Sequence, residues 1–176
     1  MRAIESTFRN KLFRMEVIMD NLDYRILTLL KNNSRIKASD ISREIHLSVS
    51  TVIERIHRME SEGIIKKYTI LTNDQKIGND VTVLMEISIE HERYNASFSK
   101  NMAGHPNVEA CYYITGDFDF IAKISCESSE KLEQIHTWIK NLKGVRATRT
   151  HYVLRTEKCS DIYIPFPDTN NKKSNK

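Results

Sequence analysis

The sequence Ser-Val-Ser-Thr-Val-Ile-Glu-Arg-Ile-His-Arg-Met-Glu-Ser-Glu, from Ser48 to Glu62, has the periodicity of an amphipathic helix. Ser48 stands at the N-cap position, and Gly63 follows the last turn, where a left-handed residue often ends a helix. At about 100° per residue, the i, i+3, i+4, i+7 spacing places one group of apolar residues on a single side. These residues are Val49, Val52, Ile53, Ile56 and Met59. The stretch therefore predicts a helix with one buried stripe.

The other side of this helix is polar and begins with hydroxyl groups. It carries Ser50, Thr51, Glu54 and Arg58, with Arg55 and His57 at its edges. Taken alone, such a face favours a solvated surface helix. Hydroxyl and guanidinium groups also bind phosphates and base edges, so the segments around the helix decide between the two interpretations.

Two shorter helices are predicted before this one. The first runs over 20–33 and is capped by Asp20, and the second runs over 37–45 and is followed by a short turn at 46–47. Three helices with a tight turn between the second and third form a helix-turn-helix, whose third element enters the major groove of DNA. We therefore predict the following DNA contacts in the third helix: Ser48, Ser50, Thr51, Glu54, Arg55 and Arg58.

A wing is expected directly after the third helix. The β-branched and aromatic residues of 64–71 predict a strand, in which Lys66 and Lys67 would meet phosphates. Residues 1–70 hold 13 Lys and Arg against 9 Asp and Glu, whereas residues 81–158 hold 10 of each. The positive excess lies in the first half of the chain, which supports a winged helix-turn-helix DNA-binding domain over 19–71.

The second half of the chain predicts a different domain. Residues 72–80 are polar and rich in turn formers, which indicates a linker. Beyond it, strands are expected over 81–90, 108–114, 118–125 and 145–157, and helices over 94–104 and 129–143. The order βαββαβ predicts a ferredoxin-like domain over 81–158, so the chain as a whole is a two-domain α/β protein.

The predicted sheet has two apolar faces but helices for only one of them. We expect the helices to cover Val83, Met85, Ile87, Ala110, Tyr112, Phe120, Ala122, Ile124, Ala147 and Val153. The other face would carry Leu84, Cys111, Tyr113, Ile121, Tyr152 and Leu154. A large exposed apolar face usually marks an interface, so we predict a homodimer through the sheet. The alternative is that residues 1–18 fold over this face.

Several classes of protein are disfavoured by composition. No apolar run is long enough to span a membrane or to act as a secretory signal, and the three cysteines form no Cys-x-x-Cys pair, so we expect a cytoplasmic protein. The six histidines show no metal-ligand spacing and no glycine-rich phosphate loop is present, so we expect no metal, no cofactor and no catalytic residue. Residues 1–18 are expected to be an extension, either a start-site artefact or a helical arm, and residues 159–176 a mostly disordered tail.

Taken in order, the motifs resemble the leucine-responsive regulatory protein/AsnC (Lrp/AsnC) family, also called feast/famine regulators. The matching stretches are Asn-Leu-Asp-Tyr-Arg-Ile-Leu at 21–27, Leu-Ser-Val-Ser at 47–50, Arg-Ile at 55–56, Glu-Gly-Ile-Ile-Lys-Lys-Tyr at 62–68, Thr-Gly-Asp-Phe-Asp-Phe at 115–120, Gly-Val at 144–145 and Thr-Arg-Thr at 148–150. The resemblance covers 19–158. It implies a regulator of transcription and of amino-acid metabolism that dimerises through its C-terminal domain and assembles further, up to octamers.

The resemblance also implies a free amino acid as effector, bound between dimers at the C-terminal domain. The residues that match the family's effector site are Thr115, Gly116, Asp117, Asp119, Thr150 and Tyr152. A turn at 115–117 suits this role, because backbone N–H groups can bind an α-carboxylate and an aspartate can bind an α-ammonium group. Two alternatives remain: the turn is an ordinary hairpin turn, or the protein is an architectural DNA-compacting protein without an effector.

Overall fold

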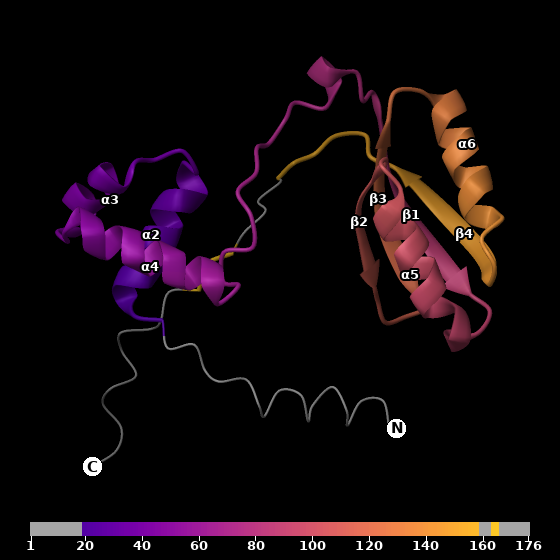
Figure 1. Ribbon diagram of the computed structural model, residues 1–176. Coiled ribbons are helices and arrows are strands. Elements are labelled where there is room, and N and C mark those ends of the chain that lie inside the picture. The colour runs from indigo at the N-terminus through magenta and orange to yellow at the C-terminus, as the bar shows by residue number, and fades with distance from the viewer. Residues whose placement is uncertain (1–18, 159–162, 166–176) are drawn as a thin grey trace, which may run out of the picture. The chain divides into compact units, whose positions relative to one another are not determined.

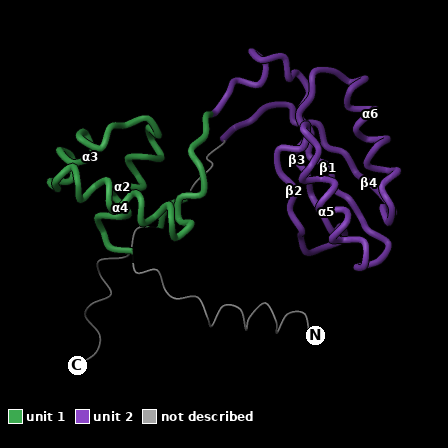
Figure 2. Tube along the Cα trace, viewed as in Figure 1, with its two compact units in different colours: residues 1–70, 160–176 green, residues 71–159 purple. Residues whose placement is uncertain are grey.

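The computed structural model describes residues 19–158 and 163–165, and these residues fall into two compact units. Figure 1 shows the elements and Figure 2 the units, the first of which includes residues 19–70 and the second residues 71–158. The predictions for residues 1–18 and for most of 159–176 lie outside the described residues. Each unit has a hydrophobic core of its own, and each is therefore described by itself.

The first unit is a helix-turn-helix built on three helices. They are α2 (Asn21–Asn32), α3 (Ala38–Ile45) and α4 (Val49–Ser61). The Asp20 carboxylate accepts hydrogen bonds from the backbone N–H groups of Leu22 and Asp23, and the Asp23 carboxylate accepts one from the N–H of Asp20 in return. This capping box fixes the start of α2. His46, in the left-handed conformation at φ 59°, ends α3 and opens the tight turn into α4.

The core of the first unit contains one residue from α2, two from α3 and two from α4. These are Ile26, Ile41, Ile45, Val52 and Met59, all at most 3% exposed. Val49 and Ile53 are each 42% exposed, so the prediction that the whole apolar stripe of α4 is buried is wrong for these two residues. The buried side of α4 centres on Val52 and Met59, and Val49 and Ile53 lie at its edge, about 60–100° away at the helical rotation per residue.

No strand forms between α4 and the second unit. Residues 64–73 run without helix or strand, and a short 3-10 helix (Gln75–Ile77) lies inside the segment that we predicted to be a linker. The prediction of a strand over 64–71 is therefore wrong, because Ile64 and Ile65 bend back and donate backbone hydrogen bonds to the Met59 carbonyl and the residues after them find no strand partner among the described residues. Ile70 and Leu71 are more than 70% exposed.

The second unit is an antiparallel four-stranded sheet with two long helices. Its elements are β1 (Val81–Ile89), a 3-10 helix (Glu92–Tyr94), α5 (Asn95–Gly104), β2 (Val108–Tyr113), β3 (Phe120–Cys126), α6 (Ser129–Lys140) and β4 (Val145–Tyr152). The strand order is β2-β3-β1-β4, which places the first and third strands in the centre. This is the order of the ferredoxin-like fold, as the sequence predicts.

The core of this unit lies between the sheet and the two helices. Val83, Met85 and Ile87 of β1 point into it, together with the alternate residues of β3 that begin with Phe120. The aromatic rings of Phe98 on α5 and Phe120 lie 4.8 Å apart. Leu132, Ile135 and Ile139 cover the sheet from α6.

The outer strands present faces opposite to those that we predicted. In the pairing register Cys111 lies opposite Ala122 and Tyr113 opposite Phe120, so these two residues of β2 face the helices and Ala110 and Tyr112 face away. On β4, Thr150 lies opposite Met85 and Tyr152 opposite Val83, which places them on the helix side and Ala147 on the other. A register shift between Val108 and Ala110 accompanies the reversal of β2, and one between Ser88 and Ile89 of β1 accompanies the reversal of β4. A one-residue shift exchanges the faces of a strand, and alternation alone does not reveal it.

The face of the sheet without helices is therefore mixed in character. Its apolar side chains are Leu84, Ala110, Tyr112, Ile121 and Ala147. Glu86, with a quarter of its side chain exposed, lies among them and contacts Arg149 at 3.5 Å and His151 at 3.3 Å. We name these eight residues the open sheet face.

Candidate functional site

Three hydroxyl groups are linked at the start of α4. The Ser48 hydroxyl accepts a hydrogen bond from the backbone N–H of Thr51 at 3.1 Å, and it lies 2.9 Å from the Ser50 hydroxyl and 2.7 Å from that of Thr51. No acidic residue stands in the first turn. Free N–H groups and the positive end of the helix dipole suit an anion at this position, so a phosphate fits here.

The side of α4 opposite the core is the surface that is free to meet another molecule. Ser50, Glu54 and His57 are exposed there, and Ile53 lies beside them. Of the predicted DNA contacts at the start of this helix, Ser48, Ser50 and Glu54 are exposed and Thr51 is partly exposed.

The two arginines of α4 are placed differently from what we expected. Both guanidinium groups turn toward α2, where Asp23 accepts hydrogen bonds from Arg55 at 2.8 Å and from Arg58 at 2.5 Å. Arg55 also contacts Asp20 at 2.8 Å. Only 22% of the Arg55 side chain and 40% of the Arg58 side chain are exposed. Their assignment to DNA remains a prediction, and their ion pairs argue against a direct contact.

The Asp20 carboxylate is held in its charged form by the same cluster. Burial opposes ionisation, but the hydrogen bonds from the backbone N–H of Asp23 and from Arg55 outweigh it and keep the pKa of Asp20 below its usual range. Arg55 in turn has a raised pKa, chiefly because of its hydrogen bond to Asp23. Asp20 and Arg55 therefore both favour their charged forms at physiological pH.

The segment after α4 is tied back to that helix by a tyrosine. The Tyr68 hydroxyl donates to Glu60 at 2.9 Å, and the other oxygen of Glu60 lies 3.1 Å from His57. Lys66 and Lys67 are both exposed just before Tyr68. Their ammonium groups are thus close in sequence to an anchored residue, which suits the phosphate contacts that we predicted.

This tie gives a titration prediction. Burial raises the pKa of Tyr68 to about 12, and the hydrogen bond to Glu60 acts in the same direction. Because the folded state holds this proton more tightly than the unfolded state, the stability that it contributes is present below about pH 10 and is lost as the pH rises toward 12. We expect ultraviolet titration to show one tyrosine ionising near pH 12. Replacing Tyr68 with Phe should remove that transition, and E60Q should move it down, so a transition unchanged in both variants would contradict the contact.

A second candidate site lies at the turn between β2 and β3. The N–H of Ile114 donates to the carbonyl of Asp119 at 2.8 Å, and the N–H of Asp119 donates to the carbonyl of Ile87 at 3.0 Å. The Asp119 carboxylate accepts from the backbone N–H of Ile89 at 2.6 Å. The two ends of the turn are therefore bonded to each other, and the Asp119 end is also bonded to the end of β1.

The residues between these ends are open to solvent. Thr115, Gly116 and Asp117 are exposed, and Gly116 has a φ of 124°, a value that L side chains rarely adopt. Asp117 is free to meet a ligand, whereas Asp119 serves the backbone. The prediction that both aspartates bind the effector is thus supported more strongly for Asp117.

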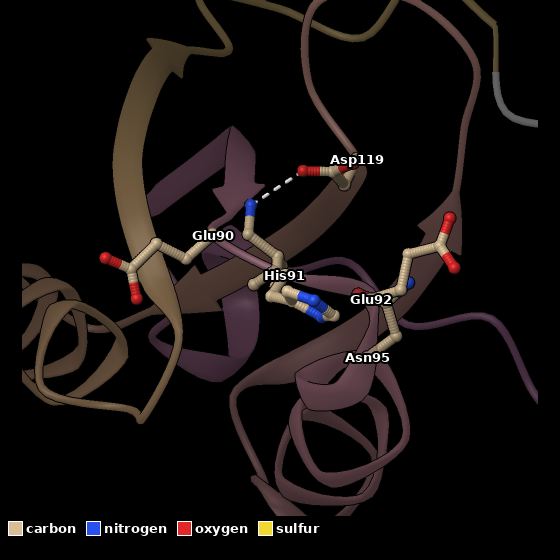
Figure 3. A pocket seen from close by; sticks show the side chains of 6 residues that line it. Glu90, His91, Glu92, Asn95 and Asp119 are labelled. Atoms are coloured by element: carbon tan, nitrogen blue, oxygen red, sulfur yellow. Dashed lines mark hydrogen bonds between the residues drawn. The ribbon is translucent and has the colours of Figure 1, made fainter.

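A hollow of about 420 Å³ lies beside the turn and was not predicted from the sequence. It is lined by Ile89, Glu90, His91, Glu92, Asn95 and Asp119. Figure 3 shows Asp119 on one side, bonded to the Ile89 N–H, with His91 and Asn95 on the other. The only sequence signal was a run of polar residues directly after a predicted strand.

Thr150 and Tyr152 lie elsewhere in the same chain. Both are on β4, level with the first half of β1, whereas Asp119 is level with its last residues and lies on the other side of that strand. Thr150 and Tyr152 are exposed. The six predicted effector residues therefore fall into two groups, one at the turn beside β3 and one on β4, with β1 between them.

Comparison with known proteins decides the family. Residues 82–163 match the protein family described as "Lrp/AsnC ligand binding domain", and residues 19–66 match the family described as "Winged helix-turn-helix DNA-binding". The chain belongs to the Lrp/AsnC family. It is thus a DNA-binding transcriptional regulator with an Lrp/AsnC ligand-binding domain, as the motifs quoted above indicate.

The relatives of this chain match it over nearly their whole length. The HTH-type transcriptional regulator FL11 of Pyrococcus furiosus is 31% identical over 144 residues, which cover 82% of this chain and 95% of FL11. The solved structure of Bacillus subtilis LrpC is 32% identical, with a TM-score of 0.70 and coverage of 81% and 99%. A transcriptional regulator of Neisseria meningitidis, solved as a complex with L-Met, is 21% identical and shares the fold, with a TM-score of 0.77 and coverage of 82% and 95%.

The described residues contain neither a candidate membrane span nor a candidate metal-binding cluster. No helix in 19–158 or 163–165 is long and apolar enough to cross a bilayer. Nor does this part of the chain contain three or more His, Cys, Asp or Glu side chains grouped so that they could hold a metal ion.

Proposed function

We propose that this Lrp/AsnC protein is a sequence-specific regulator of amino-acid metabolism that acts in the cytoplasm and responds to a free amino acid. The observation that carries the proposal is the open turn at 115–117, whose ends are bonded to each other and, through Asp119, to β1, while its own residues are exposed. The DNA-binding unit in the same chain is the activity that an effector bound at this turn regulates. The regulator acts by binding rather than by catalysis.

The DNA contacts come from the accessible part of α4 and the segment after it. The hydroxyl groups of Ser48, Ser50 and Thr51 suit phosphates at the helix N-terminus, and Glu54 can accept a hydrogen bond from cytosine. Lys66 and Lys67 add positive charge along the DNA backbone. These assignments rest on exposure and hydrogen-bonding chemistry.

The effector is an α-amino acid held by groups from two copies of the chain. The free backbone N–H groups of 115–117 suit its carboxylate, and Asp117 suits its ammonium group. Thr150 and Tyr152 of another copy complete the site, because within one chain they lie on β4, on the opposite side of β1 from the turn. L-Met in the Neisseria regulator supports an amino acid as the class of ligand.

The test is a thermal-shift screen of the proteinogenic amino acids on the full chain, read together with oligomer mass. A ligand that binds the folded state raises the melting temperature, and one that binds between copies also changes the mass distribution. If no amino acid changes either quantity, the proposal fails in favour of an architectural DNA-compacting protein without an effector.

Replacing Asp117 with Asn should weaken binding of the amino acid that gives the largest shift by about tenfold. A hydrogen bond to a charged group contributes about 1.5–3 kcal/mol, and Asn keeps the shape but loses the charge. Isothermal titration calorimetry measures the change. The matched control is Glu133→Gln, an exposed carboxylate on α6, which should leave the affinity unchanged. Equal affinities for D117N and the wild type would remove Asp117 from the site.

We further propose that the open sheet face joins two chains in a dimer and that dimers assemble up to octamers. Leu84 is 37% exposed near the centre of this face, so Leu84→Arg places an unpaired charge in the interface. We expect dissociation of the dimer to be detectable by sedimentation at micromolar concentration. Glu133→Arg on the helix side is the control, and an L84R protein with wild-type mass would contradict this interface.

A further inference from the structure

Asp23 is a fully buried carboxylate between α2 and α4. It is 0% exposed, and both of its oxygens are engaged. Oδ1 accepts from Arg55 at 2.8 Å, and Oδ2 accepts from Arg58 at 2.5 Å and from the backbone N–H of Asp20 at 3.0 Å. One buried side chain thus links the start of α2 to two consecutive turns of the recognition helix.

The charges in this cluster balance. Asp20 and Asp23 carry two negative charges, and Arg55 and Arg58 carry two positive ones. A desolvated carboxylate is tolerated only when it is paired and hydrogen-bonded, so each arginine that left Asp23 would leave part of a buried charge uncompensated. The Nε of Arg58 is itself buried without a partner, which shows that this side chain turns inward.

The ion pairs of the cluster constrain the rotation of α4 about its own axis more than apolar packing does. Arg55 and Arg58 are three residues apart on α4 and therefore project from the same side. Hydrogen bonds depend on direction, whereas contacts such as those of Val52 and Met59 tolerate small rotations. Because both guanidinium groups meet one carboxylate, the rotation of α4 about its own axis is fixed relative to α2.

We propose that Asp23 is a positioning residue for DNA recognition. It acts through Arg55 and Arg58 to set which side of α4 faces the major groove, and neither arginine contacts DNA. Ser50 and Glu54 then point outward because the arginines point inward. This inference rests on the sequence-specific DNA binding proposed above.

The test compares Asp23→Asn and Arg58→Gln with the wild-type full chain. The probes are a duplex that the wild type selects from a randomised library and a scrambled duplex of the same composition. Binding to each is measured over a range of salt concentrations, since each lost phosphate contact lowers the salt slope by about 0.9. Circular dichroism first confirms that each variant is folded.

The expected results separate positioning from direct contact. Asp23→Asn removes a negative charge, so electrostatics alone predicts tighter binding to DNA. Loss of positioning predicts the opposite: binding to the selected duplex becomes about tenfold weaker, which is the value of one base contact. Binding of D23N to the scrambled duplex should not weaken. R58Q should also bind the selected duplex less tightly with an unchanged salt slope.

Two controls calibrate these readouts. Asp40→Asn removes the same negative charge from α3, where Asp40 is partly exposed and pairs with the exposed Arg43, and it should not weaken binding to either duplex. Lys67→Gln should lower the salt slope by about one.

Three outcomes would overturn the inference. One is a folded D23N protein that binds the selected duplex as well as the wild type does. Another is an R58Q salt slope that falls as in the Lys67 variant, which would make Arg58 a DNA contact. If D23N does not fold, the R58Q slope decides alone. A wild type that selects no duplex would overturn both the sequence-specific function and this inference, whereas failure confined to the variants overturns only the inference.

Discussion

Replacing Gly144 with Ala is expected to lower the free energy of unfolding of the second unit by about 3 kcal/mol. Gly144 has a φ of 92°, where an L side chain costs about 1–2 kcal/mol. A Cβ atom there would also lie 2.4 Å from Cγ and Cδ2 of the Tyr94 ring, and such overpacking costs about 1–3 kcal/mol. The melting temperature of a unit of this size should fall by roughly 10 °C or more.

Gly78 provides a matched control for this prediction. Its φ of 88° is nearly the same, but a Cβ atom there would meet nothing within 4 Å. Gly78→Ala should therefore show only the backbone cost, about 1–2 kcal/mol. In a protein that already carries Tyr94→Ala, Gly144→Ala should lower the free energy of unfolding by less than it does in the wild type, because the ring that the new Cβ atom meets is gone. Equal destabilisation by the two glycine variants in urea unfolding would rule out the contact with Tyr94.

Replacing Asp23 with Ala should lower the free energy of unfolding of the first unit by about 3–5 kcal/mol. Removing one partner of a buried ion cluster leaves the others uncompensated, and here two guanidinium groups and the N–H of Asp20 lose their acceptor. Because Arg58 remains partly exposed, we expect a value near the lower end. Chemical denaturation followed by circular dichroism measures the loss.

The control for the Asp23 variant is Asp40→Ala on α3. Asp40 is 41% exposed and its pair with Arg43 is solvated, so this change should alter stability by no more than about 0.5 kcal/mol. If the two aspartate variants are equally stable, the buried cluster contributes no more than a surface pair does.

The helices and the order of the strands could be predicted from the sequence because each has its own hydrophobic periodicity. The faces of β2 and β4 could not. Tyr112 and Tyr113 are adjacent, equally large residues, so alternation fits either register, and the shift at 108/110 is decided by pairing with β3. On β4 the shift beside Ser88 has the same effect.

The environment of the arginines in α4 depends on a residue that is distant in sequence. Periodicity places Arg58 on the polar face of the helix and Arg55 at its edge, but it does not identify their partners. Their partner Asp23 stands 32 residues before Arg55, on the apolar side of another helix, where it is three residues from the buried Ile26. A carboxylate three residues before Ile26 is the available signal, but a negative charge in the first turn of a helix is already favoured by the helix dipole and so indicates no second partner.

The turn between β2 and β3 has one more consequence, which concerns how relatives could diverge. Its two ends are bonded to each other and to β1 through main-chain atoms and the Asp119 carboxylate. Residues 115–118 could consequently be exchanged, or their number altered, without disturbing the strands on either side. Such an arrangement lets ligand specificity change during evolution while the rest of the domain is inherited unchanged.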